Sequence, residues 1–277
     1  MTISVHTNRS ALTALQQLNK TNDRLADVQS RVNTGLKVQG AKDNASTWAV
    51  AQGQRADIGA LAAVKTSLDR AQSITDVALA AGETVSDLLT EIKAKVTAAM
   101  DPSISATSRT AIENDFKALM RQISQTVQDA EFDGANILNN SITAGIQFLS
   151  NADANRYITL SPRNLTLGGG LITFTLGANL TTVAMATTVM ARVNASIDLV
   201  NGALAAIGSQ AKQITAHNKF VSKLQDTLET GVGNLVDADL AKESARLQAL
   251  QVQQQLGVQA LGIANSAPQV VLSLFRS

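Results

Sequence analysis

Apolar residues recur every seven positions over long stretches of this chain, with polar residues filling most of the positions between them. The repeat runs through residues 11–32 near the N-terminus and through 240–261 near the C-terminus. A single helix cannot bury such a stripe on its own, so each terminal stretch requires a partner helix. The pattern therefore predicts that residues 1–36 and 235–277 pair with each other or with copies of the same chain.

The residues that we expect to make self-assembly contacts are apolar side chains on these two stripes and near the end of the chain. They are Leu15, Leu18, Leu25, Val32, Leu240, Leu247, Leu250, Leu261, Leu272, Leu274 and Phe275. Heptad stripes more often build an ordinary intramolecular bundle. At the termini, however, little other chain is expected nearby to cover the stripes, which favours contacts between copies.

Three more helical patterns lie between the terminal stretches. The first spans about 61–100 and ends before Pro102, since proline disfavours the helical conformation in the residue before it. The second covers 110–130. The third covers 190–229, and we expect the glycines within 231–233 to end it. The seven-residue line of the first is Val64, Ala71, Ala78, Val85, Ile92 and Ala99, and that of the third is Val193, Val200, Ile207, Ile214, Val221 and Leu228.

The chain changes character before the third of these patterns. Segments 142–149, 157–160 and 171–176 are rich in Ile, Thr, Phe and Leu, and Asn, Pro and a triple glycine separate them. Such composition is typical of short strands and loops. The whole order predicts a mainly α fold: an elongated antiparallel helical bundle, or coiled-coil rod, with paired terminal helices and a small β-hairpin-rich central segment.

These elements divide the chain into parts that we expect to act as domains. Residues 1–36 and 233–277 should form the two halves of an inner coiled-coil domain. Residues 37–138 supply the N-terminal helices of a rod domain, and 186–232 supply its returning long helix. Residues 139–185 should form a small, β-rich variable segment.

Candidate chemistry is sparse. The chain has two histidines and no cysteine, and neither His6 nor His217 stands in a spacing that suits zinc. The triple glycine 168–170 is not followed by the Lys-Ser/Thr of a phosphate-binding loop. A net charge of +1 with scattered charges argues against a nucleic-acid partner. We therefore expect neither an enzyme nor a cofactor.

Targeting signals are equally sparse. The first residues lack the basic stretch and apolar core of a cleavable secretion signal. No uninterrupted apolar run of about 18 residues is present, so we expect no membrane insertion. The absence of cysteine suits a cytosolic protein, and it equally suits an exported protein that travels unfolded without disulfides.

Motifs at both ends resemble those of bacterial flagellin. After the early Asn8, the N-terminal stretch closes with Asn-Thr-Gly-Leu-Lys-Val at 33–38 and continues to Ala-Lys-Asp-Asn-Ala at 41–45. Phe-Asp-Gly-Ala-Asn-Ile-Leu at 132–138 is similar to a flagellin turn motif. The acidic entry to the last helix, 237–243, and the closing run, 264–276, also match, and the closing run is the most specific of these marks.

The resemblance covers about residues 1–138 and 190–277. It implies a structural subunit that self-polymerises into the flagellar filament for swimming motility, with coiled termini packed into helical tubes. It also implies export of the unfolded chain through the flagellar type III channel to an extracellular location. Expected partners are other copies of the chain, the flagellar cap and hook-junction proteins, and an export chaperone bound to residues 235–277.

Two alternatives remain open at this point. A hook–filament junction protein would share flagellin-like ends, although the closing run and the compact middle segment favour a filament subunit. A soluble helical binding module with folded, monomeric ends is the second alternative. Protection of both terminal stretches from proteases in dilute solution would support that module.

Overall fold

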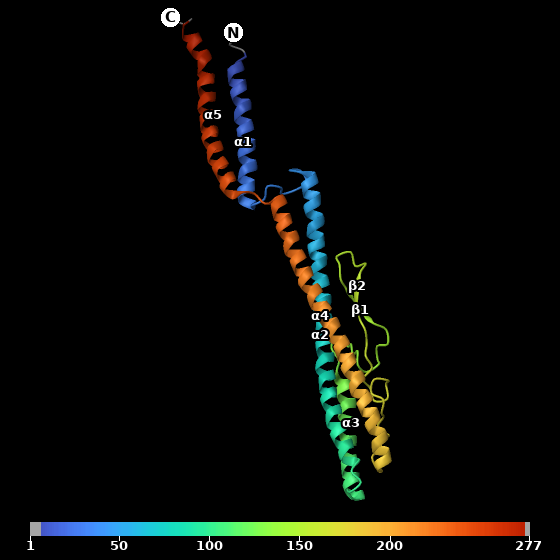
Figure 1. The fold of residues 1–277 in the computed structure, drawn as a ribbon. Helices are drawn as coiled ribbons and strands as arrows, with labels where there is room; N and C mark the ends of the chain where they lie inside the picture. The colour runs from blue at the N-terminus through green and yellow to red at the C-terminus, as the bar shows by residue number, and fades with distance from the viewer. Residues whose placement is uncertain (1–6, 275–277) are drawn as a thin grey trace. The chain divides into compact units, whose positions relative to one another are not determined.

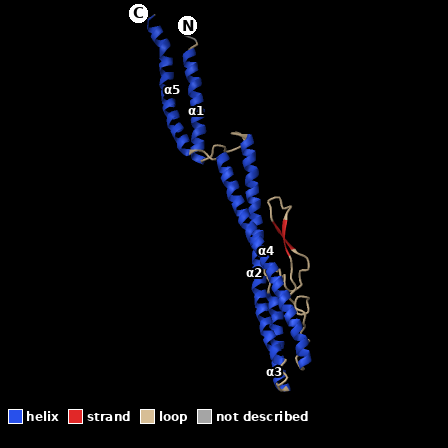
Figure 2. Cartoon of the chain, in the orientation of Figure 1, coloured by secondary structure: helices blue, strands red, loops and turns tan. Residues whose placement is uncertain are grey.

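The fold is mainly α, as the sequence predicts. The computed structural model describes the backbone of residues 7–274 and the side chains of residues 7–266. Over this range it contains five helices and one two-stranded antiparallel sheet (Figures 1 and 2). The elements are α1 (Arg9–Thr34), α2 (Ala45–Ala99), α3 (Ala106–Asp129), β1 (Ile146–Leu149), β2 (Tyr157–Leu160), α4 (Val183–Val236) and α5 (Leu240–Leu274).

The chain forms two compact units. One comprises Met1–Ala56 together with Thr227–Ser277, and the other comprises Asp57–Asp226. The first unit therefore holds α1, α5, the first turns of α2 and the last turns of α4, whereas the second holds the remainder of α2 and α4, with α3 and the sheet.

The core of the second unit is the heptad line that the sequence predicts on α2 and α4. Every member of the α2 line from Val64 to Ala99 is buried, and so is every member of the α4 line except the half-buried Leu228. Two hydrogen bonds place these helices beside each other in antiparallel order. The Ser86 hydroxyl donates to the Asn201 side-chain oxygen at 3.2 Å, and the Asn218 amide donates to Asp69.

Helix α4 is longer at both ends than the sequence predicts, and the glycines at 231 and 233 do not end it. A helical glycine costs about 1 kcal/mol relative to alanine. Val232 and Val236 are nonetheless buried, and that burial offsets the cost. The helix stops where backbone pairing replaces its own hydrogen bonds, because the Lys37 N–H donates to the Val236 carbonyl at 2.6 Å.

The central segment contains one hairpin and not three strands. Strands β1 and β2 pair antiparallel, with Ile146 opposite Leu160 and Leu149 opposite Tyr157. The predicted strand at 171–176 is wrong, since only an isolated bridge between Leu167 and Ile172 forms there. Two of the apolar side chains in this loop, Ile172 and Phe174, are fully buried, whereas Leu176 is exposed.

Phe174 anchors that loop. Its ring is fully buried, and its centroid lies 6.3 Å from that of the equally buried Phe116 on α3. The neighbouring Thr173 N–H donates to the Ser196 hydroxyl on α4 at 3.0 Å. Backbone groups nearby contribute as well, since the Gly168 N–H donates to the Ile172 carbonyl at 2.9 Å, so the loop pairs its polar groups without a strand partner.

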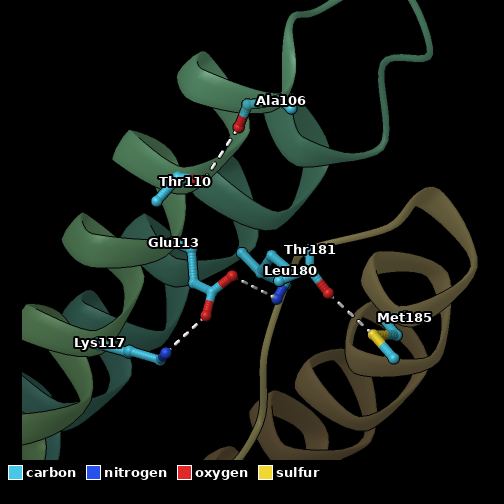
Figure 3. A network of polar contacts seen from close by, with 7 residues as sticks. All are labelled: Ala106, Thr110, Glu113, Lys117, Leu180, Thr181 and Met185. Atoms are coloured by element: carbon cyan, nitrogen blue, oxygen red, sulfur yellow. Dashed lines mark hydrogen bonds and ion pairs between the residues drawn. The ribbon is translucent and has the colours of Figure 1, made fainter.

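A buried carboxylate ties α3 to the start of α4 (Figure 3). Glu113 Oε2 accepts a hydrogen bond from the Leu180 N–H at 3.3 Å, and its Oε1 accepts one from the Lys117 ammonium at 2.5 Å. One turn away, the Thr110 hydroxyl donates to the Ala106 carbonyl at 3.0 Å. Because both oxygens of Glu113 have donors, its charge is tolerated at 6% exposure.

The motif at 132–138 forms a tight turn. Asp133 and Gly134 both have positive φ, at 49° and 76°, and Phe132 pairs with Ala135 across them. The buried Asn136 then closes the end of α3, because its amide donates to the Val127 carbonyl at 2.8 Å. Asn136 Oδ1 accepts the Leu138 N–H at 2.8 Å, so the motif joins a helix end to the loop that follows.

Candidate assembly interface

Helices α1 and α5 lie side by side in antiparallel order (Figure 1). At one end of the pair, the Asn8 amide donates to the Ala264 carbonyl at 2.7 Å. Further along, the Gln254 amide donates to the Asn22 side-chain oxygen at 2.8 Å. These bonds join residues from opposite ends of the chain, so the predicted pairing of the two terminal stretches does occur within one copy.

Capping residues define both ends of α1 and the start of α5. The Asn8 side chain accepts the Ala11 N–H at 3.1 Å, and Gly35 ends α1 in the left-handed conformation with a φ of 71°. At the start of α5 the Asp239 carboxylate accepts the Lys242 N–H at 3.1 Å. The acidic entry to the last helix therefore includes an N-cap, and a carboxylate there is also favoured by the helix dipole.

The predicted self-assembly residues fall into three groups. Within the α1–α5 pair, six are half-buried: Leu18, Leu25, Val32, Leu247, Leu250 and Leu261. Two are exposed: Leu15 and Leu240. The remaining three lie outside the described side chains: Leu272, Leu274 and Phe275. Even the paired stripe thus keeps part of its apolar surface in water within a single copy.

The two helices approach closely at Gly257. A Cβ built on this residue would lie 3.1 Å from Cδ1 of Leu18, whereas one built on Gly262, five residues further along, would meet nothing within 4 Å. A contact of this kind requires the Leu18 side chain to move by a few tenths of an ångström for even a Cβ, and further for a larger side chain. Gly257 therefore sets the local spacing of α1 and α5.

We expect Gly257→Ile to loosen the α1–α5 pair, because its branched side chain must displace Leu18. Amide hydrogen exchange should become faster throughout α1. Gly262→Ile is the matched control, since it adds the same side chain where space is open. Equal exchange in the two variants would contradict a spacing role for Gly257.

Glu243 is a buried charge at the start of the pair. It is 6% exposed, and its Oε1 accepts a hydrogen bond from Arg246 at 2.8 Å and faces Arg31 at 4.0 Å. Its Oε2 is buried without a hydrogen-bond partner among the described residues. Two guanidinium groups from the two helices thus share one carboxylate, which fixes the register of α5 on α1.

A second apolar line on α5 escaped the sequence analysis. Val252, Leu256 and Ile263 are 55%, 58% and 72% exposed. Each follows by two residues a position on the α1-facing line, namely Leu250, Gln254 and Leu261, and two residues correspond to about 200° around a helix. The three side chains therefore face away from α1, and we call them the outer stripe.

The outer stripe leaves a signal in the sequence. Ala245 and Ala249 precede it at the same alternating three- and four-residue steps, and no charged residue occurs from 247 to 275. A helix that is apolar on opposite faces is normally buried on both. By contrast, the outer face of α1 carries Lys20, Asp23 and Asp27, all exposed.

The described residues contain no metal-binding group, and their one histidine contacts the backbone. No group of three His, Cys, Asp or Glu side chains within the described residues could hold a metal ion. His217 contacts the Ser150 carbonyl through its Nε2 at 2.7 Å, and His6 lies outside the described residues. A hydrogen bond from a lone histidine to a backbone carbonyl is a structural contact.

One helix of the described chain, α4, is long and apolar enough to cross a membrane by length and composition alone. Its most apolar stretch has a mean hydropathy of 1.2 and is 28% buried. This hydropathy is an average over a stretch that also contains polar residues, so the stretch is not an uninterrupted apolar run. A core helix of a soluble protein meets the same criterion, so this property makes no membrane assignment.

Comparisons with known proteins agree with these features. The bacterial flagellin N-terminal helical region matches residues 5–143, and the bacterial flagellin C-terminal helical region matches residues 190–275. Flagellin FljJ of Caulobacter vibrioides is 50% identical over 280 residues, covering 100% of this chain and 99% of its own. A flagellin of Brucella melitensis is 39% identical over 285 residues, covering 99% of each chain.

Solved structures show the same fold at low identity. Bacillus cereus flagellin matches with a TM-score of 0.50 at 21% identity, over 56% of this chain and 88% of its own. A putative flagellar hook-associated protein from Vibrio parahaemolyticus matches with a TM-score of 0.59 at 10% identity, over 70% of this chain and 100% of its own.

Two paired terminal helices with an uncovered apolar face are the architecture of a protein that associates with its own copies. The N-terminal and C-terminal flagellin regions match the corresponding ends of the chain. The chain belongs to the bacterial flagellin family. It is a structural subunit of the bacterial flagellar filament.

Proposed function

We propose that the chain polymerises by burying the outer stripe of α5 against the terminal helices of neighbouring copies. The observation that carries this proposal is the exposure of Val252, Leu256 and Ile263 on a helix whose opposite face already contacts α1. Fully burying one such side chain is worth about 1.5–3 kcal/mol. Several copies contribute such contacts at once, so growth should be cooperative.

The two terminal helices take different positions in this scheme. Helix α5 is apolar on two faces, whereas α1 presents charged residues on its outer face. Burying those charges would be costly, so α5 becomes the more deeply buried helix of the pair. Leu15 and Leu240, both exposed in the single copy, add to the contact. Leu272, Leu274 and Phe275 extend the same role to the end of the chain.

Export of the unfolded chain through the flagellar type III channel, to an extracellular filament, is part of this proposal. Family membership supports it, and so does the absence of cysteine, since no disulfide can lock a chain that must unfold. An export chaperone bound to residues 235–277 would cover the outer stripe before assembly. The cap and hook-junction proteins would meet the same terminal helices at the ends of the filament.

Seeded growth tests the proposed function. Purified chain is added to short seeds of sheared filament, the salt concentration is raised, and filament length is followed by negative-stain electron microscopy. Long growth from the seed ends is the expected result. Seeds that are capped but never lengthen would identify a junction protein, and seeds that remain unchanged would overturn self-polymerisation.

A further inference from the structure

An acidic stripe runs along the exposed side of α2 in the second unit. Asp69, Asp76 and Glu83 follow each other at seven-residue steps, and Asp87 follows four residues later. All four are exposed. The core of α2 repeats at the same seven-residue interval, so residues seven apart keep one position relative to it. We call these four residues the acidic stripe.

Helix α4 carries a basic stripe with the same repeat. Lys212 and Lys219 are seven residues apart, and Lys223 follows four residues later. All three are exposed, and no acidic residue occurs from 199 to 225. The basic stripe therefore presents one sign of charge over about three turns of helix.

Most of the charges on the two stripes have no partner among the described residues, whereas Asp69 and Lys223 each have one. Among the described residues, Asp76, Glu83, Asp87, Lys212 and Lys219 take part in no ion pair or hydrogen bond through their side chains. The one basic residue between 69 and 87, Arg70, is engaged by Asp133 at 2.8 Å. Asp69 differs from the others, because the Asn218 amide donates to it at 2.5 Å.

We propose that the acidic stripe of one copy docks on the basic stripe of the next copy in the filament. The proposal rests on the self-polymerisation proposed above and identifies a second surface for it. Opposite charges on the two stripes make the surface complementary to another copy of the same chain. Both stripes step by seven residues, about 10.5 Å along a helix, so carboxylates and ammonium groups match in spacing.

This contact joins two different surfaces and is therefore heterologous. Heterologous contacts that do not close into a ring generate open helical arrays. Exposed ion pairs are individually weak, and their main effects are on register and on the rate of association. The stripes would thus orient an incoming copy, while burial of the outer stripe holds it in place.

Charge reversal tests the docking. Asp76→Lys with Glu83→Lys removes the net negative charge of the acidic stripe and places two ammonium groups at its centre, and Lys212→Glu with Lys219→Glu makes the net charge of the basic stripe negative. Each variant should elongate homologous seeds about tenfold more slowly than the wild type at 0.15 M salt, because like charges now meet at the reversed positions. An equimolar mixture of the two variants, and a single chain with all four substitutions, should both recover growth, since opposite charges meet again.

Two matched pairs control for net charge. Asp129→Lys with Glu131→Lys adds the same charge as the first reversal, and Lys93→Glu with Arg121→Glu adds the same charge as the second. All four control residues are exposed and lie outside the stripes. They should elongate at the wild-type rate, and circular dichroism should show the same unfolding temperature for every variant.

The outcomes separate the two proposals. Wild-type chain that elongates while both reversal pairs grow normally would overturn the stripe docking alone. Stripe docking is also overturned if the mixture and the fourfold variant fail to recover, or if the control pairs slow growth equally. Wild-type chain that never elongates would overturn self-polymerisation, and the stripe docking with it.

Discussion

Replacing the outer stripe with glutamine should abolish filament growth. The triple variant Val252→Gln, Leu256→Gln, Ile263→Gln keeps helix-compatible side chains but removes the apolar surface that neighbouring copies would bury. The free chain should be unaffected, with an unfolding temperature within about 2 °C of the wild type, because exposed substitutions rarely change stability much. Seeded elongation measures the first result, and thermal unfolding followed by circular dichroism measures the second.

A second triple variant separates the position of the change from its chemistry. Leu176→Gln, Met185→Gln and Leu199→Gln replace three exposed apolar residues of the second unit with the same side chain. This control should still elongate. Growth of the outer-stripe variant at the control's rate would mean that α5 is not covered through these residues in the filament.

Phe116→Ala should be the most destabilising of the single substitutions considered for the free chain. The ring is fully buried on α3, and its centroid lies 6.3 Å from that of Phe174, in the segment whose composition predicts a strand. Removing a buried aromatic ring costs about 3–5 kcal/mol through lost burial and the cavity left behind. Urea unfolding monitored by circular dichroism gives this difference as a lower midpoint.

The partner ring supplies an internal check on that prediction. Phe174→Ala should cost a similar amount, and the double variant should cost less than the two single losses combined, because both remove one contact. Phe220→Ala is the control, since that ring is 57% exposed and its loss should change the midpoint little. Additive losses at 116 and 174 would show that the two rings act independently.

The helices that line the core could be predicted because their signal is repeated many times. The line from Val64 to Ala99 and the line from Val193 to Val221 are long enough that an occasional small or polar residue does not obscure the period. The strand at 157–160 also has the predicted bounds. In each case the pattern reports the face that will be buried.

Two errors show where such patterns lose their meaning. The segment 171–176 has strand-like composition because Ile172 and Phe174 need burial, and burial under helices satisfies that need without pairing. The glycines at 231 and 233 are residues of the kind that commonly end a helix. Neighbouring Val232 and Val236 are buried, however, and the helix continues through the glycines because of that packing.

The sequence pattern predicts only one of the two apolar faces of α5, for a related reason. A search for one seven-residue stripe on the last helix finds the α1-facing line through Leu247 and Leu261, and it stops there. The outer stripe repeats at the same interval on the opposite face, so its residues look like interruptions of the first. Only the exposure of Val252, Leu256 and Ile263 reveals them as a second surface.

The pairing of α1 with α5 also makes the interface depend on the presence of both helices. Asn8 holds the carbonyl of Ala264, and the Ala238 N–H donates to the Gly35 carbonyl at 2.8 Å. Helix α1 is synthesised well before α5, so the pair can form only after translation has passed α5. We therefore expect a copy that lacks α1 or α5 to lose the pair and to add poorly to a growing filament.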